Sequence, residues 1–152
     1  MARRKRVEPS PPEVAERPRV PRRDAEGRIA RFGELMIVVA GLLVFGVAAL
    51  AFIDAGFSLV GSSEFGDVSG WLAGIPVVWL YIEDVRAWRG VRGRIGVLLI
   101  SAALAVAAGF AVENVLLDLP QLVSGALAII TACLVFAPLW FFGIRWLDRQ
   151  LG

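Results

Sequence analysis

The stretch Ile82–Arg94 reads IEDVRAWRGVRGR and separates two long apolar regions of the chain. It carries four arginines, Arg86, Arg89, Arg92 and Arg94, and we expect them to face lipid headgroups. Loops rich in arginine and lysine stay on the cytoplasmic side of a bacterial membrane. The side on which this segment lies therefore determines the direction of every apolar segment around it.

The apolar regions on both sides are long enough to cross a membrane. The 152 residues include 57% apolar side chains, and the mean hydropathy is +0.68. Residues 35–53, 95–112 and 120–144 contain no charged side chain. At about 1.5 Å of helical rise per residue, each has about the length of a hydrocarbon layer of roughly 30 Å. We therefore expect an all-α, polytopic membrane protein.

A fourth membrane helix is expected over residues 68–82, although this segment is short. Asp67 and Glu83 bound it, which leaves fewer apolar residues than the usual span of about 17–25. A re-entrant segment is the alternative. With three crossings the central arginines would lie opposite the basic N-terminal residues, whereas with four crossings both lie on one side. The positive-inside rule favours four transmembrane helices arranged as two hairpins, at about 35–53, 68–82, 95–112 and 120–142.

Basic residues are confined to three parts of the chain. Of the 16, ten lie in residues 1–31, four in the central segment and two at positions 145 and 149. The segments 54–67 and 113–119, which join the helices on the other side, have none. Both termini are therefore predicted to be cytoplasmic. Nearly all of the basic residues are arginine, which is typical of a GC-rich bacterium, so we expect the bacterial inner membrane.

Residues 1–31 have a composition unlike that of the remaining chain. They hold five of the eight prolines, together with ten basic and five acidic residues. Such a segment buries too little apolar surface to offset its chain entropy. We expect a disordered cytoplasmic tail over 1–31 and a four-helix transmembrane domain over 32–152. The tail offers no folded basic surface, so nucleic acid is not an expected partner.

No pattern in the chain indicates catalysis. There is no histidine, the single cysteine, Cys133, lies within an apolar run, and no phosphate loop or metal-ligand spacing is present. We therefore expect no enzymatic activity, no cofactor and no metal.

Ionisable groups close to the membrane are the remaining candidates for function. A charge within lipid is costly and often functional, which singles out Glu113 with its neighbour Asn114, and Asp54. The alternative is that these residues, like Glu83 and Asp84, are solvated charges that mark helix ends.

Small residues recur at the spacing that lets helices pack closely. Gly70 and Gly74 form a GxxxG pattern, and Ser101, Ala105 and Gly109 recur every four residues. They serve either packing within one bundle or a contact with a partner or a second copy. The sequence thus predicts a non-enzymatic accessory or interaction subunit of a membrane complex, with membrane lipids and another membrane protein or a second copy as partners. The alternatives are a small oligomeric transporter or lipid-translocating protein around Glu113 and Asp54, and a holin-like permeabilising protein.

Overall fold

The computed structural model describes residues 21–61 and 64–151, and within these ranges it is helical with no β-strand. The elements in chain order are α1 Phe32–Leu59, the 3-10 helix η1 Gly70–Gly74, α2 Ile75–Ala87, α3 Arg94–Val115 and α4 Gln121–Leu151. The predicted all-α class is confirmed. In the described part of the chain, α1, α3 and α4 are long and apolar enough to cross a membrane.

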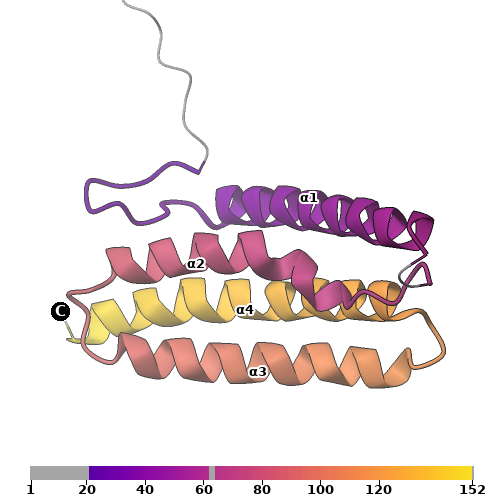
Figure 1. Ribbon diagram of the computed structural model, residues 1–152. Helices are drawn as coiled ribbons and strands as arrows, with labels where there is room; N and C mark the ends of the chain where they lie inside the picture. Colours follow the sequence, from indigo (N-terminus) through magenta and orange to yellow (C-terminus); the bar gives the residue numbers. More distant parts are fainter. Residues whose placement is uncertain (1–20, 62–63, 152) are drawn as a thin grey trace, which may run out of the picture.

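The helices lie side by side and run alternately in opposite directions (Figure 1). One end of the molecule carries the loop 21–31, the turn between α2 and α3, and the last residues of α4. We call it the Asp84 end. The opposite end carries the connections from α1 to η1 and from α3 to α4, and we call it the Gly70 end.

The second apolar segment forms two short helices in place of the single helix predicted over 68–82. Pro76 lies in the first turn of α2, where a missing N–H is tolerated. Within a continuous α-helix from Gly70, the same proline would clash with the preceding turn. The chain therefore forms η1 first and begins α2 at Ile75. Because α2 has 13 residues, helix length does not establish the predicted fourth crossing or the two-hairpin arrangement.

The other helices extend beyond the charges expected to end them. Asp54 lies inside α1, not after it, because its carboxylate is fully buried (0% exposed) and accepts a hydrogen bond from the Gly66 N–H. The prediction that α4 ends near 142 is also wrong. The helix continues to Leu151, and the side chains of Arg145 and Arg149 within it each donate to the carbonyl four residues earlier, at 3.0 and 3.3 Å.

Residues 21–31 form a folded loop, whereas composition predicts disorder as far as 31. The Asp24 carboxylate accepts hydrogen bonds from the N–H groups of Glu26 and Arg28, and Gly27 takes a positive φ of 81° to close the turn. Ile29 then buries its side chain to 1% exposure. The burial of this apolar side chain offsets part of the entropy lost when a charged segment becomes ordered. The predicted disorder of residues 1–20 lies outside the described residues.

Small residues bring α3 against α4. Ser101, Ala105 and Gly109 form the buried face of α3. A Cβ added to Gly109 would lie 3.0 Å from the Ala128 carbonyl oxygen of α4. This close approach follows from the spacing of small residues in the sequence.

Candidate functional site at the Asp84 end

Asp84 is carried into the interior by the spacing of residues along α2. Val77, Tyr81, Asp84 and Trp88 are all buried and recur at intervals of four, three and four. This is the period of one face of an α-helix. Asp84 is therefore 3% exposed, although it was interpreted above as a solvated charge at a helix end.

The Asp84 carboxylate joins three segments of the chain. Its Oδ2 accepts a hydrogen bond from the Trp140 Nε1–H of α4, at 2.8 Å. Its Oδ1 accepts one from the backbone N–H of Ile29 in the 21–31 loop, at 3.2 Å. A buried carboxylate is tolerated when donors such as these replace water. The group is thus a junction between α2, α4 and the loop.

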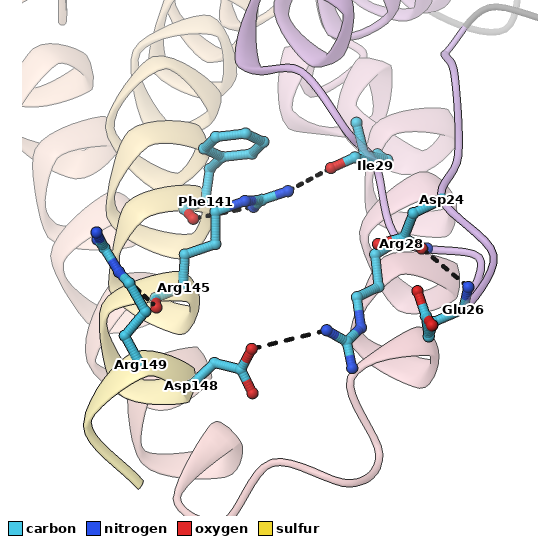
Figure 2. Close-up of polar contacts among 8 residues, drawn as sticks. All are labelled: Asp24, Glu26, Arg28, Ile29, Phe141, Arg145, Asp148 and Arg149. Atoms are coloured by element: carbon cyan, nitrogen blue, oxygen red, sulfur yellow. Dashed lines mark hydrogen bonds and ion pairs between the residues drawn. The ribbon is translucent and has the colours of Figure 1, made fainter. Parts of the chain in front are cut away.

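Arg145 holds the same residue of the loop, Ile29, through its carbonyl. Its guanidinium donates to the Ile29 carbonyl and to the Phe141 carbonyl, as Figure 2 shows. The guanidinium also lies 3.4 Å from the centroid of the Phe141 ring and 5.3 Å from that of Trp88. The planar fork of arginine is suited to combining hydrogen bonds with stacking. Ile29 is therefore held by Asp84 through its N–H and by Arg145 through its carbonyl.

A second arginine of the loop reaches the last turns of α4. Arg28 lies 3.7 Å from the Asp148 carboxylate (Figure 2). Its guanidinium also stacks over the Trp88 ring, 4.3 Å from the ring centroid. The Trp88 indole is thus near two guanidinium groups, those of Arg28 and Arg145. Three buried donor atoms around this end, Arg28 Nε, Trp88 Nε1 and Arg94 Nη1, have no hydrogen-bond partner among the described residues.

This arrangement, which we call the loop clamp (Ile29, Asp84, Trp140 and Arg145), positions a segment of the chain. Each oxygen of the Asp84 carboxylate accepts one hydrogen bond, from a backbone N–H and from an indole N–H. Within residues 21–61 and 64–151 there is also no cluster of three or more His, Cys, Asp or Glu able to hold a metal ion. The loop clamp joins the 21–31 loop to α2 and α4.

The predicted functional residues lie at the opposite end and have separate partners. Glu113 is half-buried and accepts a hydrogen bond from the Trp71 Nε1–H at 2.9 Å, while Asn114 is exposed. Asp54 accepts its bond from the Gly66 N–H at 2.6 Å, and its Oδ1 is buried with no partner in the described chain. The structure does not bring these residues together around a shared group.

The glycines predicted for helix packing lie where η1 touches its neighbours. A Cβ on Gly70 would lie 2.1 Å from the Ala126 nitrogen of α4, and one on Gly74 would lie 2.5 Å from Ile129 Cγ1. Gly46 of α1, which the sequence reading missed, approaches the Ala73 carbonyl in the same way, at 2.1 Å.

The central arginines differ from one another in exposure. Arg86, Arg89 and Arg92 are exposed, as expected for headgroup contact, whereas Arg94 is half-buried.

The sequence reading missed the loop clamp for two reasons. The period of Val77, Tyr81, Asp84 and Trp88 does signal an inward-facing Asp84. However, nearby Arg86 and Arg89 favoured a solvated interpretation. Nothing in the sequence connects Ile29 with that face, because the bond spans 55 positions.

Comparison with known proteins finds no matching family model, no similar curated protein and no similar solved structure.

Proposed function

We propose that this protein crosses the bacterial cell membrane four times, with both termini in the cytoplasm. A 3-10 helix rises about 2.0 Å per residue and an α-helix about 1.5 Å, so η1 and the uncharged part of α2, residues 75–82, together extend about 22 Å. That length is shorter than the usual hydrocarbon layer of roughly 30 Å, and local thinning of the bilayer accommodates the difference. The combined segment runs beside α1 and α4 (Figure 1). The absence of basic residues from 54–67 and 113–119 supports the same topology.

Within the membrane the protein acts as a non-enzymatic accessory or interaction subunit. The observation that carries this proposal is the loop clamp, which fastens residues 21–31 to α2 and α4. The loop clamp thus anchors residues 21–31, which follow a sequence that carries the basic run RRKR at 3–6. A basic segment presented from a fixed point beside the bilayer suits contact with a partner subunit.

The topology is tested by reporter fusions. Fusions after Glu64 and after Leu117 should read external, and fusions after Arg92 and at the C-terminus should read cytoplasmic. An external signal after Arg92 would contradict four crossings and favour a re-entrant η1–α2 segment.

The interaction role is tested by co-purification in mild detergent. A partner should be recovered with the wild type and with Glu83→Ala, which changes an exposed neighbour, but lost with Asp84→Ala, which releases the loop. Equal recovery from Asp84→Ala would contradict a role for the loop clamp. Collapse of the membrane potential on induced expression would instead favour the holin-like alternative.

A small oligomeric transporter remains the second candidate because of Asp54. This carboxylate is fully buried within a candidate membrane helix and has one oxygen without a partner in the described chain. Ionisable groups in such positions are often part of a proton or ion path. Loss of proton-coupled uptake in Asp54→Asn, with folding retained, would move this candidate ahead of the interaction subunit.

A further inference from the structure

An apolar crevice lies between α2, α3 and α4. Its volume is about 370 Å³, and its floor includes Ala132 and Phe136 of α4. Val78 and Ile82 of α2 and Val106 of α3 line it and are also exposed, so the crevice opens on the outer surface of the bundle. In a membrane this mouth faces lipid.

Two polar groups distinguish the crevice from an ordinary gap between helices. Arg86 is its one charged lining residue, and no carboxylate of the described chain forms an ion pair with it. Tyr81 also lines the crevice; it is 7% exposed, and its hydroxyl is buried without a hydrogen-bond partner among the described residues. Buried hydroxyls normally have partners, so the Tyr81 group signals an acceptor that is supplied from outside the chain.

We propose that the crevice binds one acyl chain of an anionic phospholipid, with the phosphate on Arg86. The apolar walls match the chain, and the unpaired guanidinium matches the phosphate. Tyr81 precedes Arg86 by five positions, about 7.5 Å along the helix axis. We therefore expect Tyr81 to lie deeper in the membrane than a phosphate on Arg86, on the side of the lipid ester carbonyls, which accept hydrogen bonds. The inference rests on the proposed crossing of α2.

A helix of a second copy is a poorer occupant. A helix with its side chains is about 10–12 Å wide, and the crevice volume lies at the lower end of ligand pockets. A single unbranched chain fits such a space, whereas a helix does not.

The test is native mass spectrometry of the full-length protein in mild detergent, titrated with phosphatidylglycerol or phosphatidylcholine. The wild type should retain one phosphatidylglycerol in preference to phosphatidylcholine. Arg86→Gln should weaken that binding about fivefold, the effect of one basic residue near a headgroup. Arg89→Gln, which changes an exposed arginine outside the crevice, should leave the affinity unchanged.

A second pair of variants tests the apolar walls. Val106→Trp should fill the crevice and abolish retention, while Leu99→Trp, at an exposed position of α3 outside it, should not. Equal effects of Arg86→Gln and Arg89→Gln, or equal binding of both lipids, would overturn the proposal even if Val106→Trp failed to fold. The proposal would also be overturned if the wild type were a dimer and Val106→Trp, but not Leu99→Trp, dissociated it. Lipid binding is measured on purified protein and topology in cells, so failure of either proposal is recognised separately.

Discussion

The segment formed by η1 and α2 packs against α4 at both ends of the molecule, but by opposite means. At the Gly70 end, η1 and α4 meet backbone to backbone, because a Cβ on Gly70 would lie 2.1 Å from the Ala126 nitrogen. At the Asp84 end, aromatic rings separate α2 from α4, and the Tyr81 and Phe136 ring centroids lie 4.5 Å apart. The first contact requires that a side chain be absent, and the second requires that particular side-chain atoms be present.

This difference has consequences for function. Glycine contacts hold the Gly70 end closed, whereas the larger separation at the Asp84 end leaves room for the crevice and for buried polar bonds. The contact of Gly70 with α4 should therefore tolerate no added atom, and the Asp84 end should tolerate substitutions that preserve hydrogen-bond geometry.

The largest effect is expected for Gly70→Ala. The new methyl group would meet backbone atoms of α4 that cannot rotate away, so we expect a loss of at least about 3 kcal/mol in the free energy of unfolding. Gly41→Ala is the matched control, since nothing lies within 4 Å of a Cβ there. The measurement is unfolding of the detergent-solubilised protein by SDS. A loss at Gly70 no greater than at Gly41 would show that η1 does not touch α4.

Asp84→Ala should come next. It leaves the Trp140 indole N–H and the Ile29 N–H buried without an acceptor, at a cost of about 2–4 kcal/mol. Asp84→Asn retains one carbonyl acceptor, and we expect about half that loss. Glu83→Ala removes only an exposed contact with Arg23 and should stay within about 1 kcal/mol. If the SDS unfolding curves of all three variants coincide, the loop clamp contributes nothing to stability.

A smaller and more local effect is expected for Arg145→Lys. An ammonium retains the charge but cannot bond the Ile29 carbonyl while stacking on Phe141, so the 21–31 loop should open more often. We expect hydrogen exchange in the loop to rise about tenfold, which corresponds to about 1.4 kcal/mol. Arg149→Lys alters an exposed helix contact and serves as control. Unchanged exchange in Arg145→Lys would assign the docking to Asp84 alone.

The smallest effect is expected at Glu113. Glu113→Gln keeps an oxygen that can accept from the Trp71 indole and should cost less than about 1 kcal/mol. Glu113→Leu leaves that donor unpaired and should cost about 1–2 kcal/mol. Asn114→Ala, at an exposed neighbour, should change stability by no more than about 0.5 kcal/mol. Equal unfolding free energies for the Gln and Leu variants would show that the Trp71 contact does not matter.

Local patterns in the sequence were sufficient for the class of the protein. Long charge-free runs predicted the three helices of membrane length in the described chain, and the four-residue spacing of Ser101, Ala105 and Gly109 marked the buried face of α3. Both properties depend on neighbouring residues alone, because burial in a helix repeats every few positions. The predicted helix limits were less accurate, because Asp54 and Arg145 lie inside helices. Each of these charged groups has a hydrogen-bond partner elsewhere in the fold.

The site could be read from the sequence only in part. The spacing of Val77, Tyr81 and Trp88 already places Asp84 on the inward face of its helix. The partners of that carboxylate lie 55 and 56 positions away, at Ile29 and Trp140. Only the tertiary structure decides such a pairing, because it depends on which helix faces meet and how far apart the backbones stay. The separation of α2 from α4 leaves room for the bond between Asp84 and Trp140. The same carboxylate then holds the 21–31 loop through Ile29.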